Sequence, residues 1–364
     1  MTFPELSRLR MLNQQIEGSV CTSPKELLSS MGAIQAQDFA MAKWAIGQRI
    51  PDSTRLSIET AYDAGNIIRT HLMRPTWHLV SSDDIYWMLE LTAPQIRKIL
   101  NTNDKRFELT DQIYAKTNTV LENVLSNNCS MTREELVQEF ENVHIRTDEN
   151  RLSHILMRAE LDGVVCSGPI RKNKLTYALL ADRVPLKKTG TRDESLFTLA
   201  GRYFSSHGPA TLRDFVWWSG LGVTEARKAL EMIKAGFLSE TIGTETYWFA
   251  EPMKKTLPFT PSVHLLPAYD EYLISYANRS AALAIVNNKK TISDNGIFRP
   301  VIVIDGQVEG LWKRTTIKDK VKIETSHFKV HDSETIRSLK QEATRYGIFL
   351  DKKIDLVIQD LTLV

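Results

Sequence analysis

Two glutamines stand two residues apart in the stretch Gly32-Ala33-Ile34-Gln35-Ala36-Gln37-Asp38. Asp38 is placed to cap the following run as a helix, because its short carboxylate can accept unpaired amide protons of the first turn. Gln35 and Gln37 then lie on the extended approach to that helix, where residues two apart point to the same side. We therefore expect the two carboxamides to face one point.

A glutamine cannot act as a base at neutral pH, but its carboxamide supplies two donors and an acceptor. Two such groups that face one point can hold a water molecule or a sugar oxygen by geometry alone. The other interpretation is a pair of solvated polar residues, and these seven residues by themselves leave it open.

The chain as a whole has the composition of an ordinary globular protein. It has 364 residues, of which 42% are hydrophobic and 25% charged, and its formal net charge is +2. This length is enough for two or three domains. We expect a cytoplasmic protein, since the N-terminus lacks an apolar leader and no uncharged apolar run is long enough to span a bilayer. Three widely separated cysteines indicate neither a disulfide framework nor a zinc site.

Three segments repeat one pattern: a helix, a capped second helix, a third helix, and then short strands. In the middle copy, Thr110 to Asn127 predicts the first helix, the capping box Thr132-Arg133-Glu134-Glu135 opens the second, and Gly163 ends the third. Three helices followed by a two-stranded flap is the layout of a winged helix, whose third helix can enter a DNA groove. The same packing is common in proteins that never touch DNA, so the pattern leaves the function open.

The sequence thus predicts an α+β fold with three tandem winged-helix motifs and a C-terminal α+β piece. The expected units are 1–108 with the two glutamines, 109–192 with a basic wing, 193–260, and the C-terminal domain 261–364. In the last unit, Asp305-Gly306 is a strong turn signal for a β-hairpin.

Two sets of residues are expected inside the protein. A buried polar network is expected to join the C-terminal piece to the repeats, formed by Tyr269, Asp270, Tyr272 and Arg279. Three tryptophans have apolar flanks at helical spacing, which predicts core positions for Trp44, Trp217 and Trp218.

Basic residues gather in the second wing. From Arg171 to Arg192 there are seven basic residues and one acid, Asp182. Such an excess suits a phosphate-facing surface, because each neutralised phosphate releases counterions, although a solvated loop can carry the same charges. The expected DNA contacts come from this wing, from the first wing and from the C-terminal hairpin: Arg171, Lys172, Lys174, Lys187, Lys188, Arg69, Arg74, Lys313 and Arg314.

Three blocks of the sequence resemble the winged-helix DNA-binding-domain proteins that include the AlkZ-like bacterial DNA glycosylases. They are Ile34-Gln35-Ala36-Gln37, the stretch from Arg69 to Val80, and the stretch from His264 to Tyr272, and the resemblance spans nearly the whole chain. The family's Gln-x-Gln element matches Gln35 and Gln37, so the resemblance implies that these two are the catalytic pair. In the family's Arg-Gly-Thr-x-His element this chain has Pro75 in place of the glycine, and proline fixes φ and removes a donor.

The resemblance implies a monofunctional glycosylase that hydrolyses the N-glycosidic bond of purines alkylated at N7 or N3, with interstrand crosslinks as a further substrate. The alkylated base is positively charged and leaves without a proton from the enzyme, so the site must only position water and tolerate an oxocarbenium-like sugar. The expected partner is alkylated or crosslinked double-stranded DNA in the bacterial nucleoid, with no obligate protein partner, no metal and no cofactor. The alternative is a DNA-binding regulator without chemistry.

Three further residues of the first unit have alternative roles. Asp38 is expected to cap the helix, or else to stabilise the developing sugar cation. His78 is expected to be a satisfied structural histidine, or else to contact phosphate or the site. Lys43 is the nearest candidate for a Schiff base, but it sits a turn and a half along the helix on its far side, so no lyase activity is expected.

Overall fold

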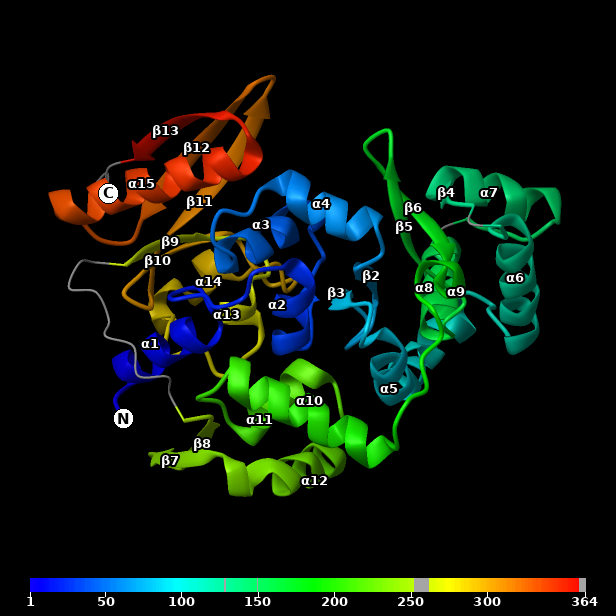
Figure 1. Ribbon diagram of the computed structural model, residues 1–364, viewed down its shortest axis with the longest axis horizontal. Coiled ribbons are helices and arrows are strands. Elements are labelled where there is room, and N and C mark those ends of the chain that lie inside the picture. Colours follow the sequence, from blue (N-terminus) through cyan, green and yellow to red (C-terminus); the bar gives the residue numbers. More distant parts are fainter. Residues whose placement is uncertain (128, 149, 252–261, 360–364) are drawn as a thin grey trace.

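The computed structural model describes residues 1–127, 129–148, 150–251 and 262–359, and within these ranges the fold is mixed α/β with four small sheets (Figure 1). The expected boundary at residue 260 lies outside the described residues. Within the described part of the chain, no helix combines the length and apolar character needed to cross a bilayer.

The first unit carries the two glutamines and forms the centre of the molecule in Figure 1. After α1 (Phe3–Asn13), its elements are α2 (Pro24–Met31), β1 (Ile34–Gln35), α3 (Phe39–Arg49), α4 (Arg55–Asp63), β2 (Ile67–His71) and β3 (Trp77–Ser81). The strands form one sheet in the order β1-β3-β2, and Gln35 pairs with His78. The helices expected in this unit are confirmed, because the side chains of Ser23, Asp38 and Thr54 cap α2, α3 and α4 as their sequence positions indicate.

Two later segments repeat the same order of elements. The second contains α6 (Asp111–Val124), β4 (Met131–Thr132), α7 (Arg133–Asn142), α8 (Arg151–Leu161), β5 (Val165–Arg171) and β6 (Lys174–Leu179). The third contains α10 (Arg192–Ser206), α11 (Leu212–Ser219), α12 (Val223–Ile233), β7 (Leu238–Ile242) and β8 (Glu245–Phe249). In each copy, an extended residue or short strand before the second helix pairs with the last strand: β1 with β3, β4 with β6, and Ala210 with Trp248 of β8.

One long helix was not expected from the sequence. α5 (Ile85–Arg106) follows the first copy, contains Pro94, and has Asp84 as its N-cap residue, although the Asp84 side chain makes no capping hydrogen bond. Proline normally interrupts a helix, so Pro94 argues locally against one helix of this length. The short helices α9 (Leu180–Arg183), α13 (Glu271–Ile274) and α14 (Asn288–Thr291) were missed as well.

The C-terminal piece is a five-stranded sheet with one long helix. Its strands are β9 (Val263–Leu266), β10 (Val301–Ile304), β11 (Gln307–Ile317), β12 (Lys320–His327) and β13 (Lys353–Gln359), and α15 (Ser333–Leu350) joins the last two. The sheet order is β13-β12-β11-β10-β9, with only β12 and β13 parallel among the described pairs. Asp305 and Gly306 both have positive φ, 46° and 79°, as a two-residue hairpin turn requires, so the predicted hairpin is confirmed.

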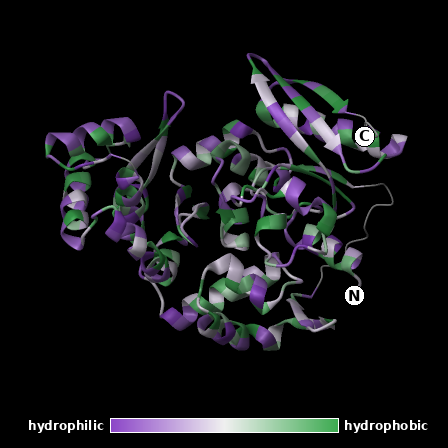
Figure 2. Cartoon of the chain, turned by 180° about the vertical axis from the view of Figure 1, so that it is seen from behind, coloured by the Kyte–Doolittle hydropathy of each residue, from purple (hydrophilic) through white to green (hydrophobic). Residues whose placement is uncertain are grey.

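The first unit shares its core with the C-terminal piece. Trp44 of α3 packs against Tyr346 and Phe349 of α15, with ring centroids 4.8 and 5.0 Å apart, and its indole nitrogen donates to the carbonyl of Leu265 at 2.7 Å. A second core joins β2 and β3 to α5, α10, α11 and α12. Both cores fix the strands around the glutamines. The tip of the β5–β6 hairpin lies away from these cores and carries hydrophilic residues (Figure 2).

The expected interior is confirmed in part. Asp270 and Tyr272 are buried, whereas Tyr269 and Arg279 are only partly buried. Asp270 forms a two-pronged ion pair with Arg49 of α3, and the hydroxyl of Tyr272 donates to the carbonyl of Gly306 at 2.6 Å. Trp44 and Trp218 are buried. The expectation for Trp217 is wrong: it is 44% exposed, because α11 turns Phe215 and Trp218 toward the core and leaves position 217 on the outer face.

Candidate active site on the first unit

The two glutamine side chains contact the same short segment, residues 74–77, between β2 and β3. The Oε1 atom of Gln35 accepts a hydrogen bond from Nη2 of Arg74 at 2.9 Å. The Oε1 atom of Gln37 accepts from the backbone N–H of Trp77 at 3.4 Å. Gln35 is only 5% exposed whereas Gln37 is exposed, so the pair runs from the protein interior to its surface.

The residue between the glutamines is fixed through its backbone. The N–H of Ala36 donates to the carbonyl of Trp77 at 2.7 Å, and its carbonyl accepts from Nε of Arg69 at 3.0 Å. The Arg69 guanidinium also lies 3.9 Å from the centre of the Trp77 ring, a distance at which the cation is attracted to the aromatic face. The segment 35–37 is therefore held at every residue by β3 or by an arginine.

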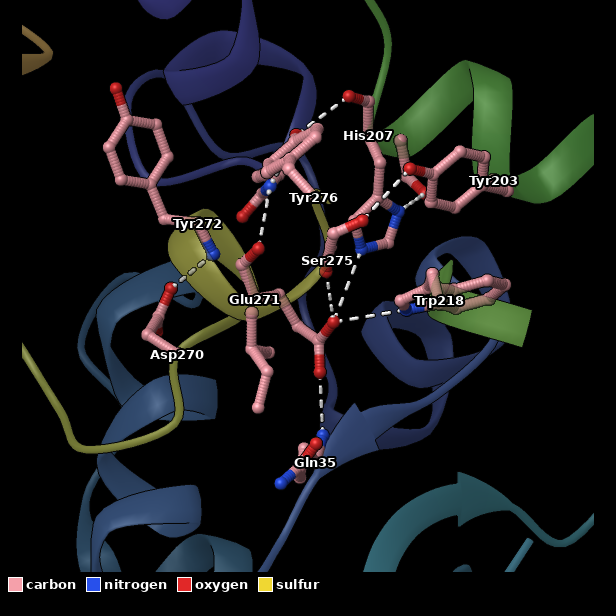
Figure 3. A network of polar contacts seen from close by, with 12 residues as sticks. Gln35, Tyr203, His207, Trp218, Asp270, Glu271, Tyr272, Ser275 and Tyr276 are labelled. Atoms are coloured by element: carbon pink, nitrogen blue, oxygen red, sulfur yellow. Dashed lines mark hydrogen bonds and ion pairs between the residues drawn. The ribbon is translucent and has the colours of Figure 1, made fainter. Parts of the chain in front are cut away.

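A buried carboxylate lies behind β1 (Figure 3). Oε1 of Glu271, in α13, accepts the backbone N–H of Gln35 at 2.6 Å. Its other oxygen accepts from Nε1 of Trp218 at 3.1 Å and from the hydroxyl of Ser275, and lies 3.6 Å from Nε2 of His207. Burial by itself would raise the pKa of Glu271, but the groups contributed by His207, Ser275 and Gln35 outweigh it and lower that pKa to about 2. Glu271 is thus an anion at neutral pH.

His78 lies opposite Gln35 in the β1–β3 pairing and is fully buried. Its Nδ1 atom is 2.9 Å from the carbonyl of Thr76, which can only accept, so Nδ1 carries the proton. Burial, together with the nearby charge of Arg74, lowers the pKa of His78 to about 3. His78 is therefore a neutral structural residue, and its burial does not fit a contact with DNA phosphate.

Arg74 occupies an unusual backbone position directly before Pro75. Its φ is +56°, in the left-handed region that only a few per cent of non-glycine residues adopt. Proline at position 75 is thus compatible with a turn in which the residue before it takes the left-handed conformation. A Cβ on Gly220, the residue that ends α11, would lie 3.2 Å from the Arg74 nitrogen, so Gly220 leaves room for this turn. Strain of this kind is typical of functional sites, where the surrounding structure holds it in place.

Asp38 and Lys43 take the structural roles expected for them. Oδ1 of Asp38 accepts the N–H of Met41 at 3.0 Å, so the predicted helix cap is confirmed, and the side chain is exposed beside Gln37. Nζ of Lys43 lies 2.5 Å from a carboxylate oxygen of Glu59. An ammonium group engaged in an ion pair is a poor nucleophile.

The residues expected to bind DNA fall into two groups. Arg69 is buried against Ala36 and Trp77, which does not fit the expected DNA contact, and Arg74 is partly buried against Gln35. Four basic residues of the stretch from Arg171 to Arg192 form ion pairs with carboxylates from other elements: Arg171 with Glu135, Lys174 with Glu134, Lys187 with Asp83, and Arg192 with Glu225. The local excess of positive charge read from the sequence is thus partly neutralised in the fold.

The remaining residues expected to contact DNA are more exposed to solvent. Lys172 and Lys188 are exposed, and within the described residues neither forms an ion pair. Lys313 is 68% exposed and lies 3.5 Å from Glu324, while Arg314 is partly buried near Tyr346. The tips of the β5–β6 and β11–β12 hairpins project toward the same edge of the molecule in Figures 1 and 2. In the part of the chain that the structure describes, no cluster of three or more histidine, cysteine or acidic side chains is arranged to hold a metal ion.

The model of the DNA glycosylase AlkZ-like family matches residues 28–349. The chain belongs to the AlkZ-like DNA glycosylase family. The resemblance carried by the three sequence blocks is thereby confirmed, and so is the expectation of DNA glycosylase and DNA repair as the family's function.

Two relatives show how far the similarity to other AlkZ-like proteins extends. The "Interstrand DNA cross-link repair glycosylase" of Streptomyces sahachiroi is 26% identical over 335 residues, covering 84% of this chain and 85% of the relative. The solved structure of the DNA glycosylase AlkZ of the same organism matches with a TM-score of 0.79 at 20% identity, over 99% of this chain and 100% of that one. The mixed α/β fold is therefore shared along the whole chain.

Glu271 is the residue of this site that sequence reasoning missed. It belongs to the block from His264 to Tyr272 that carries the family resemblance, and it follows Asp270, which was expected to be buried. The only local signal is that Glu271 stands beside Asp270 in a largely apolar stretch, because its contact with Gln35 spans 236 residues of sequence.

Proposed function

We propose that this protein is a monofunctional DNA glycosylase that hydrolyses the N-glycosidic bond of N7- or N3-alkylated purines in double-stranded DNA. The observation that carries the proposal is the pair of carboxamides, Gln35 and Gln37, held against the same turn in a chain of the AlkZ-like family. Purines joined in an interstrand crosslink through N7 are a second class of substrate, because they carry the same positive charge. The name of the Streptomyces relative supports this extension.

The chemistry required is mild at the leaving group and demanding at the sugar. An alkylated purine departs as a neutral base without a proton, so the enzyme must stabilise an oxocarbenium-like sugar and place a water molecule beside it. Gln37 lies at the surface, where the deoxyribose arrives, and Gln35 lies beneath it. Arginine has only donors, so its contact fixes Oε1 of Gln35 toward Arg74 and leaves the amide Nε2 to donate to water or a sugar oxygen. Asp38 is an accessory carboxylate that can stabilise the developing sugar cation, since the helix cap uses only its Oδ1 atom and its side chain is exposed.

The structure offers no alternative route through His78 or Lys43. A base with a pKa near 7 is the efficient choice for proton abstraction, whereas His78 is buried with a pKa of about 3. A Schiff base requires a free amine, whereas Lys43 is paired with Glu59. Hydrolysis without strand cleavage is the reaction that these residues support.

We further infer that the three repeated segments are winged-helix units, 1–108, 109–192 and 193–260, followed by the C-terminal domain 261–364. The shared order of elements and the pairing of the first strand with the last support this interpretation. The exposed residues Lys172, Lys188 and Lys313 would then contact DNA phosphates from the hairpins and the adjoining linker. The protein would act where its substrate is, in the bacterial nucleoid.

The test is a reaction. A duplex that carries one N7-methylguanine is incubated with the wild type, Gln35→Ala and Gln37→Ala, and abasic sites are counted after alkali treatment. We expect product from the wild type and a loss of about 100-fold or more in the rate of each variant, as for other oriented hydrogen-bond donors. Protection of the duplex without abasic sites, unchanged in both variants, would identify a DNA-binding regulator instead.

A further inference from the structure

Gln35 stands on a strand that is too short to hold itself in place. β1 has two residues and lies at the edge of its sheet, with β3 as its only strand neighbour in the described fold. Along a strand, successive N–H groups point to opposite sides. The N–H of Ala36 points to β3 and bonds Trp77, so the N–H of Gln35 points away from the sheet.

The Glu271 carboxylate takes the place of the missing strand neighbour. It accepts the outward N–H of Gln35 at 2.6 Å, slightly shorter than the ~2.7–2.9 Å typical of a charge-assisted N–H···O⁻ bond, and its side chain is 0% exposed. Two donors fix the carboxylate itself, Nε1 of Trp218 from α11 and the hydroxyl of Ser275 at the end of α13, and Nε2 of His207 at the end of α10 lies 3.6 Å away (Figure 3). The position of β1 is thus set by the packing of α10, α11 and α13.

Glu271 also balances the charge that orients the Gln35 side chain. Arg74 donates to Oε1 of Gln35 from one side, and Glu271 accepts the Gln35 N–H from the other. The negative charge of Glu271 raises the pKa of Arg74, against the stronger lowering by burial. Gln35 therefore lies between a fixed cation and a fixed anion, one acting on its side chain and the other on its backbone.

We propose that Glu271 is a positioning residue for catalysis: its buried carboxylate holds the backbone of β1 so that the Gln35 carboxamide faces the sugar in the reactive orientation. This inference rests on the proposed glycosylase function. It does not place Glu271 in contact with the substrate. A misplacement of about 1 Å in a catalytic group can cost on the order of 100-fold in rate, so a small shift of β1 has a measurable effect.

Two substitutions separate the effect of the length of the Glu271 side chain from the effect of its charge. Glu271→Asp keeps the negative charge but shortens the side chain, so the bond to the Gln35 N–H is lost. Glu271→Gln keeps the length but removes the charge, and its single carbonyl oxygen cannot accept both from the Gln35 N–H and from the donors of Trp218 and Ser275. The matched control is Asp104→Asn: Asp104 is another buried carboxylate, it accepts a hydrogen bond from the hydroxyl of Tyr114 at 2.8 Å, and no contact joins it to residues 34–37 within the described fold.

The experiment measures single-turnover release of N7-methylguanine at saturating enzyme, together with duplex affinity and thermal unfolding. We expect Glu271→Asp to slow the rate by about 10- to 100-fold, with Kd for the duplex changed less than about twofold. Asp104→Asn should lower Tm and leave the rate within about twofold of the wild type. If Glu271→Asp reacts at the wild-type rate, or loses no more rate than Asp104→Asn, the inference is overturned.

A double-mutant cycle with Gln35 distinguishes positioning from general loss of structure. If Glu271 acts through Gln35, adding Glu271→Asp to Gln35→Ala should slow the reaction by less than about twofold further. A further loss as large as in the wild-type background would overturn the inference, because the two residues would then act independently. A wild type that releases no base refutes the proposed function itself, and this result differs from an active wild type with an indifferent Glu271.

Discussion

Replacing Arg74 by lysine separates two roles, the DNA contact that the sequence predicts and the orienting group for Gln35 that the structure indicates. Nη2 of Arg74 lies 2.9 Å from Oε1 of Gln35, and Nη1 lies 3.5 Å from the carbonyl of Trp217. Lysine keeps the positive charge but offers one compact ammonium instead of a planar fork, so it cannot span the two acceptors. Arg74→Lys therefore releases the Gln35 carboxamide while the charge of the surface stays the same.

The size of the effect follows from the contact that is lost. A hydrogen bond to a charged group contributes about 1.5–3 kcal/mol. Each ~1.4 kcal/mol lost in the transition state slows a reaction about tenfold. If the oriented carboxamide acts in the transition state, Arg74→Lys should slow base release at saturating enzyme by about 10- to 100-fold.

The assay is the same single-turnover reaction, combined with titration of a fluorescent duplex at several salt concentrations. Lys188→Met is the comparison, because Lys188 is exposed and no ion pair is described for it. That variant should weaken duplex binding and reduce its salt dependence, with the saturated rate unchanged. A weakened Kd for Arg74→Lys with a wild-type saturated rate would refute the orienting role and return Arg74 to the DNA surface.

Four more outcomes follow from the structure. Between pH 5 and 8 the rate at saturating enzyme should change less than about twofold, since the pKa of His78 is about 3 and that of Glu271 is about 2. A catalytic base with an ordinary histidine pKa would instead change the rate about 30-fold over this range. The pKa of His78 in the folded state lies below its unfolded value of about 6.5, so His78 contributes its full stability above pH ~6.5, and the free energy of unfolding falls by about 2 kcal/mol from pH 7 to pH 5 as the unfolded chain takes up a proton. In urea unfolding, His78→Gln should lose this part of the pH dependence. Borohydride should trap no covalent DNA complex, because Lys43 is paired with Glu59, and a trapped complex that disappears in Lys43→Ala would contradict this. Charge reversal at Lys188 should weaken binding to unrelated duplexes more than charge reversal at Lys187, which is already paired with Asp83; equal effects would show that this ion pair opens on DNA.

The elements that the sequence predicts well are those specified by neighbouring residues. Asp38 caps α3 through an amide three residues away, Thr132 and Glu135 form the expected capping box, and Asp305-Gly306 makes the expected turn. In each case the donor, the acceptor and the backbone conformation lie within one turn of chain, so residue types alone decide the outcome.

The features that the sequence does not reveal depend on partners far away in the chain. Seven basic residues in the second wing suggest a strongly positive surface, yet Lys187 is neutralised by Asp83, 104 residues away, and Arg171 by Glu135. Arg69 has the residue type of a DNA contact, but the fold places its guanidinium against Trp77 and Ala36. A count of charges along the chain cannot include carboxylates and rings that only the tertiary fold brings near.

The groups around Gln35 also limit which bonds the proposed enzyme can break. A neutral purine must gain a proton as it leaves, and that proton has to come from a group that titrates near neutral pH. Glu271 stays ionised and His78 stays neutral throughout that range, so neither can supply it. A carboxamide held between a fixed cation and a fixed anion stabilises the sugar equally well for any leaving base. Selectivity then comes from the positive charge of the alkylated base rather than from a pocket that recognises its shape. A bulky crosslinked purine shares this positive charge with a small methylated one.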